Sequence, residues 1–231
     1  MASSSRNKVG AESAATNVTV SNSEQYSNSI KKNQKVLIAA LIGIVVGVAG
    51  FFGYKEFIQK PNEEKAAAAL FRAERWFEID SLNYVINGDG QNDGALAVVN
   101  KFGSTDAGNL AHYYLGMSYL RIGEFDNAVT HLNKFSGKNT PFEYLAYGNL
   151  GDAYMELEQM DKGIDAYVKA AGNKDDLFIT PLYLLRAGLA SQKAGKNEDA
   201  IKYFQKIKSE YPNSLQGRDI EKHLATLGVI D

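Results

Sequence analysis

The sequence predicts an all-α protein, an α-solenoid of stacked helical hairpins preceded by a single transmembrane helix. Two observations predict this fold. The first is an uncharged run of nineteen residues, 36–54. The second is a helical pattern that recurs after Pro61, with glycines at Gly116, Gly151 and Gly188, which are 35 and 37 residues apart. A period in this range is typical of helical hairpins stacked one on the next.

Charge and composition exclude several classes of function. The 231 residues carry a net charge of −2, but residues 1–61 hold seven Lys or Arg against three Asp or Glu, and residues 62–231 hold eighteen against twenty-four. A mildly acidic domain lacks the surplus of cations that nucleic-acid binding needs. The chain has no cysteine, which excludes disulfides, thiolate catalysis and cysteine-based zinc sites.

The uncharged run predicts a transmembrane helix over residues 36–57. Nineteen residues at about 1.5 Å each make a helix of roughly 28 Å, enough to cross the hydrocarbon core of a bilayer. Residues 1–35 are rich in Ser, Asn and Ala, and we expect a disordered cytoplasmic tail there.

Flanking lysines predict the orientation of the span. Lys31, Lys32 and Lys35 stand before it, and Lys55 and Lys60 follow it. This bias favours a cytoplasmic N-terminus, so that the C-terminal domain lies on the far side of the membrane. A cleaved signal peptide is the alternative, with residues 48–50 as its small-residue cleavage site.

Small residues recur within the span at four-residue spacing. Ala39, Gly43 and Gly47 share one face, and such faces let two membrane helices approach closely. We therefore expect a transmembrane helix contact at these three residues. The alternative is that Gly and Ala occur here only because both are common in membrane spans.

Residues 62–231 are expected to form the helical-repeat domain. An atypical first repeat spans 62–102 and holds a long helix, a loop over 87–94 and a short helix. That loop resembles a calcium-binding loop, but the required glutamate position is Asn100. A turn of Gly, Asn and Asp is therefore the preferred interpretation.

Three regular repeats are expected at 109–138, 144–174 and 181–212, and a capping helix at 216–227. Thr140-Pro141 and Thr180-Pro181 predict a capping residue followed by proline at a helix start. Asn197 is expected to cap the last long helix, and Pro212 to end it. The glycine of each first helix is expected to lie against a small residue of the second helix. These small residues are Ala128, Gly163 and Ala200.

The spacing within the repeats resembles that of the tetratricopeptide repeat (TPR) family. The residues Leu115, Gly116, Tyr119, Ala128 and Leu132, with their two echoes, match the family pattern W-x₂-L-G-x₂-Y followed by A, F and P. The sequence departs from it at His112, Tyr147 and Leu184, where the family has Trp, and at Gly163 and Ser191. The resemblance implies a right-handed superhelix.

The resemblance also implies a groove for a peptide or protein, lined by the first helix of each hairpin. The positions that project into it are mostly apolar, which is typical of protein-binding surfaces; burial in the core is the alternative for each. They are Tyr113, Met117, Leu120, Leu145, Asp152, Met155, Leu182, Leu185, Leu189 and Lys193. Only Asn149 and Arg186 match the family's carboxylate-clamp positions, so a carboxylate clamp is not expected.

No enzyme, cofactor, metal or small-molecule substrate is expected. The three histidines, His112, His131 and His223, are scattered along the sequence, and their spacing predicts no catalytic arrangement. We expect His112 to pack between hairpins and His131 to lie beside Leu132 on an outer face.

The layout resembles the YfgM-like proteins of the Gram-negative inner membrane, which have one span and a periplasmic TPR domain. That resemblance implies an ancillary subunit of the Sec translocon (SecYEG), which associates with the channel and a periplasmic chaperone and contacts translocating client polypeptides. The alternative is a structural scaffold of another envelope assembly, such as machinery for outer-membrane protein insertion or secretion.

Overall fold

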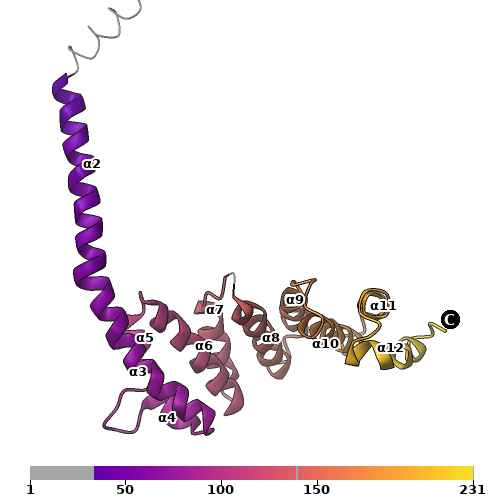
Figure 1. Cartoon of the computed structure of the whole chain (residues 1–231). Helices are drawn as coiled ribbons and strands as arrows, with labels where there is room; N and C mark the ends of the chain where they lie inside the picture. The colour runs from indigo at the N-terminus through magenta and orange to yellow at the C-terminus, as the bar shows by residue number, and fades with distance from the viewer. Residues whose placement is uncertain (1–33, 139, 231) are drawn as a thin grey trace, which may run out of the picture. The chain divides into compact units, whose positions relative to one another are not determined.

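The computed structural model describes residues 34–138 and 140–230. The chain divides into two compact units, one ending at Lys60 and the other beginning at Pro61. The described part of the chain is helical, apart from loops and one isolated bridge between Gly88 and Asp93 (Figure 1). The all-α prediction is confirmed.

The first unit contains one apolar helix. Helix α2 spans Gln34–Tyr54 and is followed by a π-helical segment, η1, at Lys55–Gln59. By length and composition α2 can cross a membrane, although a signal sequence near an N-terminus has the same properties. Gln34 and Lys35, the last two residues of the predicted tail, are helical, and residues 1–33 lie outside the described part.

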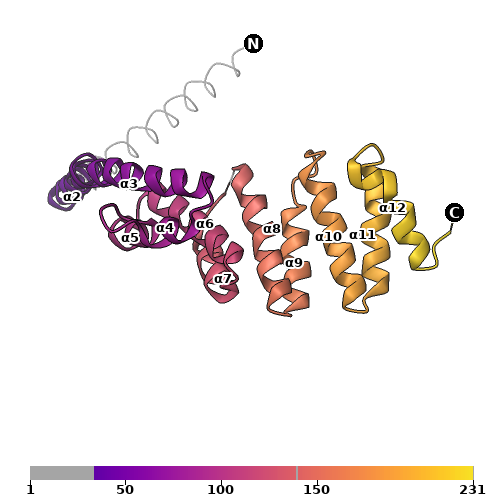
Figure 2. The ribbon, with the colours of Figure 1, turned by 90° about the horizontal axis from the view of Figure 1, so that it is seen from below.

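The second unit is a row of stacked helical hairpins (Figure 2). The hairpins are α6 (Asp106–Arg121) with α7 (Phe125–Lys134), α8 (Pro141–Glu156) with α9 (Met160–Ala170), and α10 (Ile179–Lys193) with α11 (Asn197–Glu210). Each hairpin packs on the next, and α12 (Leu215–Thr226) packs against α10 and α11 at the end of the row. The predicted solenoid and its capping helix are both present.

The atypical first repeat contains an unexpected helix. Helix α3 spans Lys60–Glu78, α4 spans Leu82–Asn87 and α5 spans Ala95–Phe102. Only α3 and α5 were expected. Glu63 of α3 fixes this repeat to the first hairpin, because its carboxylate accepts the backbone N–H of Asp106 at 2.7 Å and of Ala107 at 2.8 Å. These N–H groups open α6 and have no partner within their own helix.

The mid-helix glycines make room for large side chains. A Cβ on Gly116 would lie 2.5 Å from Cγ of Leu132, and a Cβ on Gly151 or Gly188 would overlap the ring of Tyr167 or Phe204. The side chains of Leu132, Tyr167 and Phe204 therefore fill the space beside these glycines. Of the small residues predicted on the second helices, Ala128 and Ala200 are fully buried, and a Cβ on Gly163 would lie 3.4 Å from the carbonyl oxygen of Gly151.

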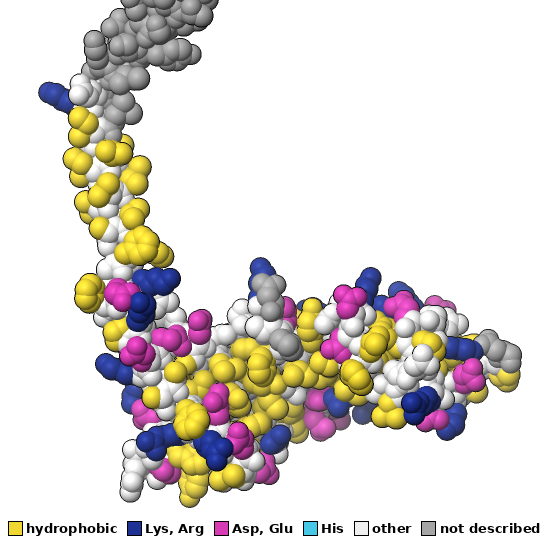
Figure 3. Space-filling model, in the orientation of Figure 1, with side chains coloured by type: hydrophobic (Ala, Val, Ile, Leu, Met, Phe, Trp, Pro, Cys, Tyr) yellow, Lys and Arg dark blue, Asp and Glu magenta, His cyan; other side chains and the backbone are white. Residues whose placement is uncertain are grey.

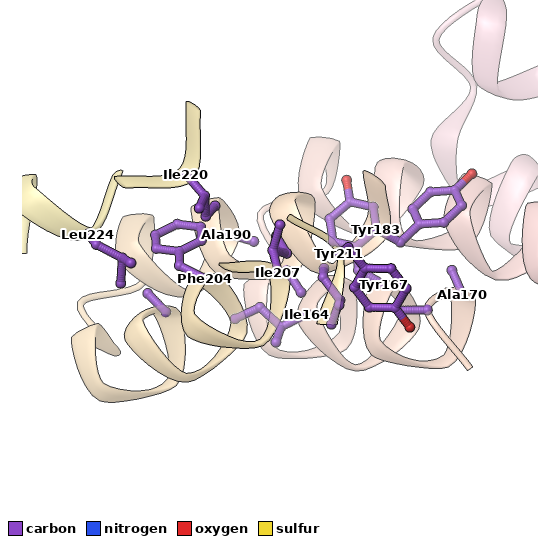
Figure 4. Close-up of a cluster of buried hydrophobic side chains, with 14 residues drawn as sticks. Ile164, Tyr167, Ala170, Tyr183, Ala190, Phe204, Ile207, Tyr211, Ile220 and Leu224 are labelled. Carbon is purple, nitrogen blue, oxygen red and sulfur yellow. The ribbon is translucent and has the colours of Figure 1, made fainter. Parts of the chain in front are cut away.

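Large buried side chains form the core between the hairpins (Figure 4). At the C-terminal end of the row, Phe204, Ile207 and Ile220 are fully buried, and Tyr167 is nearly so. These side chains come from α9, α11 and α12, so one buried cluster joins the end of the second hairpin to the third hairpin and the capping helix.

All three hairpin turns share one backbone conformation. Gly123, Glu158 and Gly195 follow the first helix of each hairpin with φ values of 83°, 57° and 73°. In each turn the N–H of the next residue bonds back to the helix, as Lys196 does to the carbonyl of Ser191 at 2.8 Å. Two of the turns use glycine, which adopts this conformation without strain, and the middle turn does not.

The helix starts differ in detail from the prediction. Thr140 is the N-cap of α8, but its hydroxyl donates to the carbonyl of Gly137 at 2.6 Å rather than accepting from the helix. Thr180 lies inside α10, whose start is capped by Asp176, which accepts the N–H groups of Phe178 and Ile179.

Helix α11 begins at Asn197, and Lys196 is its N-cap. Asn197 is therefore the first helical residue, and its predicted capping role was wrong. Helix α11 ends at Glu210, so Pro212 follows the end as predicted.

Candidate functional site

The predicted groove residues come from the first helices α6, α8 and α10, but their exposure differs. Tyr113 is 5% exposed and packs between Phe135 and Phe142, with ring centroids 5.2 and 5.4 Å away. It therefore belongs to the core. Leu189 is 41% exposed, and Lys193 is also exposed.

The remaining predicted groove residues are half-buried. Five of the seven pack against the core clusters, and each of the seven keeps part of its surface exposed. They are Met117, Leu120, Leu145, Asp152, Met155, Leu182 and Leu185. On the face seen in Figure 3, apolar side chains gather over the middle of the repeat unit, between α6 and α8, with charged side chains around them.

An ion pair lies among the groove positions. Arg186 of α10 donates to Asp152 of α8, and Tyr167 of α9 donates its hydroxyl to the same carboxylate at 2.7 Å. Burial and this hydrogen bond raise the pKa of Tyr167. Arg186 is one of the two residues that match carboxylate-clamp positions. Its guanidinium is already paired with Asp152 of the same chain.

A second apolar surface lies at the C-terminal end and was missed from the sequence. A pocket of about 570 Å³ opens between the start of α10 and the turn from α11 to α12. Three of its side chains are large and exposed, namely Leu177 at 62%, Phe178 at 84% and Leu215 at 75%. They come from loops and helix ends, where no periodic pattern marks them.

Two histidines that are distant in sequence meet between α6 and α7. Nδ1 of His112 lies 2.9 Å from Nδ1 of His131. The ring of His131 also stacks on Tyr119, with centroids 5.5 Å apart. Burial lowers the pKa of both histidines, that of His131 to about 4. The expectation that His131 lies on an outer face was wrong, because His131 is half-buried against α6.

The calcium-like loop is a turn. Oδ1 of Asp89 accepts the backbone N–H groups of Gln91 at 3.0 Å and of Asn92 at 2.7 Å. The hydrogen bonds from Asn92 lower the pKa of Asp89. Among residues 34–138 and 140–230, no group of three or more His, Cys, Asp or Glu is placed to hold a metal ion.

The small-residue face of α2 is open. A Cβ placed on Gly43 or Gly47 would have no neighbour within 4 Å, and Ala39 is exposed. A second helix could approach closely here, and the helix contact stays a prediction.

Comparison with known proteins identifies the repeats. Residues 111–177 and 183–214 match family models of the tetratricopeptide repeat. No curated protein matches the chain. A crystal structure of MamA protein is similar at 24% identity and a TM-score of 0.49, covering 84% of this chain and 96% of that one. A second structure, described as MamA AMB-1, shows 22% identity and a TM-score of 0.38, covering 65% and 90% of the two chains. The matched segments coincide with the three hairpins, so these hairpins are tetratricopeptide repeats.

Proposed function

We propose that this chain is a membrane-anchored protein-binding module whose repeats lie in the periplasm and hold extended or partly folded segments of client polypeptides. Tetratricopeptide repeats are protein-interaction modules, so the partner is a protein. The finer proposal is an ancillary Sec translocon subunit that associates with the channel and with a periplasmic chaperone.

The observation that carries the proposal is the incomplete burial of apolar side chains on α6, α8 and α10. Met117, Met155, Leu185 and Leu189 are incompletely buried on three successive first helices. A row of partly exposed apolar side chains offers contacts that do not depend on one client sequence, and methionine adapts its shape to different partners.

The layout supports the choice of the translocon as partner. One apolar helix, α2, precedes the repeats and is long enough to cross a bilayer. Its face at Ala39, Gly43 and Gly47 leaves room for a close helix contact within the membrane. A span that contacts the channel would hold the groove near emerging polypeptides.

The structure selects the variant that tests the groove. Leu120 and Leu185 pack against core clusters, so an aspartate there would unfold the domain as well as change the groove. Leu189 is 41% exposed in α10, and Val168 in α9 is a matched control at 39%. Leu189→Asp should reduce crosslinking to a translocating secretory polypeptide, and Val168→Asp should not. Equal crosslinking by both variants would contradict the groove proposal.

Orientation has its own test. Protease added to intact spheroplasts should digest the C-terminal unit if it lies in the periplasm. Digestion only after lysis would place that unit in the cytoplasm and would contradict both the location and the proposed role.

A scaffold in another envelope assembly is the second candidate. The exposed side chains of Leu177, Phe178 and Leu215 favour it, because they form an apolar contact surface at the end of the stack. Affinity purification from gently solubilised membranes separates the two proposals. Recovery of translocon subunits supports the first, and recovery of a different envelope assembly, lost on Phe178→Ser, supports the second.

A further inference from the structure

Two of the chain's three histidines form a contact that the proposed function does not use. His112 of α6 and His131 of α7 approach through their Nδ1 atoms at 2.9 Å, with ring centroids 5.1 Å apart. In this neutral contact one Nδ1 donates a proton and the other accepts it. Both rings are half-buried, so their nitrogens are held at this spacing by the packing of the hairpin.

The separation suits two ligands of one metal ion. Imidazole nitrogens bind zinc at about 2.0–2.1 Å, which places two neighbouring ligand nitrogens roughly 2.9–3.4 Å apart for bond angles from a right angle to the tetrahedral value. The observed 2.9 Å lies at the lower end of this range. A metal ion therefore requires little change in the distance between the two nitrogens.

We propose that His112 and His131 form a bidentate site for a divalent transition metal ion of the zinc, nickel and copper class, which joins α6 to α7. On binding, the shared proton leaves Nδ1 and is replaced by a proton on Nε2 of the same ring, so both rings stay neutral and no net proton is released. Each ring turns about its Cβ–Cγ bond, so that its Nδ1 lone pair points at the metal rather than at the other nitrogen.

The surroundings set the strength of the site. Over the described ranges no third side chain of the usual ligand types joins the pair, so water completes the coordination. The positive charge of Lys134 lowers the pKa of both histidines, and the same charge would repel a bound metal cation. We therefore expect exchangeable binding, weaker than that of a four-ligand structural zinc site.

Calorimetric titration of the tag-free, full-length chain in detergent with zinc or nickel chloride at pH 7 tests the site. His223→Gln is the matched control, because His223 packs on Phe204 of α11, with ring centroids 5.3 Å apart, away from the pair. Wild type and His223→Gln should bind one equivalent. His112→Gln and His131→Gln should bind at least about tenfold more weakly, since one imidazole remains. Equal binding by all four proteins would mean an adventitious ion only, and absence of binding to wild type would also overturn the proposal.

A second measurement needs only the wild-type chain, so it holds even if a variant fails to fold. Diethylpyrocarbonate modifies accessible imidazoles, and mass spectrometry locates the modified residues. Added zinc should protect His112 and His131 and leave the modification of His223 unchanged. Protection of all three residues, or of none, would contradict the site.

Discussion

Nη1 of Arg186 lies 2.5 Å from Oδ1 and 2.7 Å from Oδ2 of Asp152. The two residues are 34 positions apart and belong to adjacent hairpins. The hydroxyl of Tyr167 reaches the same carboxylate from α9. The carboxylate therefore connects α8, α9 and α10, and it holds the neighbouring first helices in register.

Removing this carboxylate should destabilise the stack more than removing its cationic partner. Asp152→Ala leaves the half-buried Arg186 unpaired and Tyr167 without its acceptor, at a cost of about 1–3 kcal/mol. Arg186→Ala leaves Asp152 bonded to Tyr167 and should cost about 0.5–1 kcal/mol, since solvent screens the pair. Urea unfolding followed by circular dichroism measures both, and equal losses would contradict this assignment.

The middle hairpin turn should be improved by glycine. Glu158 has a φ of 57°, where the sister turns have Gly123 and Gly195. Relief of this conformation outweighs the greater freedom of glycine in the unfolded chain, so Glu158→Gly should stabilise the protein by about 0.5–1 kcal/mol. The reverse change, Gly195→Glu, should destabilise it by about 1–2 kcal/mol. A lower urea midpoint for Glu158→Gly would refute the strain argument.

The third hairpin should not tolerate a methyl group at its glycine. Gly188→Ala places a Cβ against the buried ring of Phe204, and such overpacking costs about 1–3 kcal/mol. The smaller side chain of Phe204→Leu should recover part of this loss in the double variant. Urea unfolding of wild type, both single variants and the double variant measures this effect. If the losses of unfolding free energy in the single variants add up to the loss in the double variant, the two positions are not in contact.

Acid should weaken the first hairpin through its histidine pair. The pKa of His131 is about 4 in the folded protein, below the ordinary value of 6.5, and that of His112 is also lowered. The unfolded chain then binds more protons, so stability is complete above about pH 6.5 and is lost as the pH falls towards 4. His131→Gln should lessen this loss by about 1–2 kcal/mol. Identical pH profiles of unfolding free energy for wild type and variant would contradict the assignment.

Periodic features of the fold were predictable from the sequence. The spacing of Gly116, Gly151 and Gly188 identified three hairpins, because each hairpin repeats the same close helix contact. The partners of these glycines were harder to infer. Leu132, Tyr167 and Phe204 fill the space, and their sizes differ although their role is the same.

Contacts that join distant parts of the chain were not predictable. The His112–His131 pair depends on how two helices rotate against each other, and the Asp152–Arg186 pair on how two hairpins stack. The pocket at Phe178 is formed by loops, which lack periodicity. The groove was predicted by projection from the repeat pattern. Tyr113 is buried in the core, and the groove stays a prediction for the other positions.

The central claim is that the surface along the first helices contacts client polypeptides. Its most direct test is a photo-crosslinking amino acid placed at Leu189 in α10 and, in a second strain, at Val168 in α9, whose exposures are 41% and 39%. The account predicts that a secretory polypeptide arrested during translocation crosslinks at position 189 and not at position 168. Crosslinking at position 168 with none at position 189 would place the contact on the other surface and contradict the account.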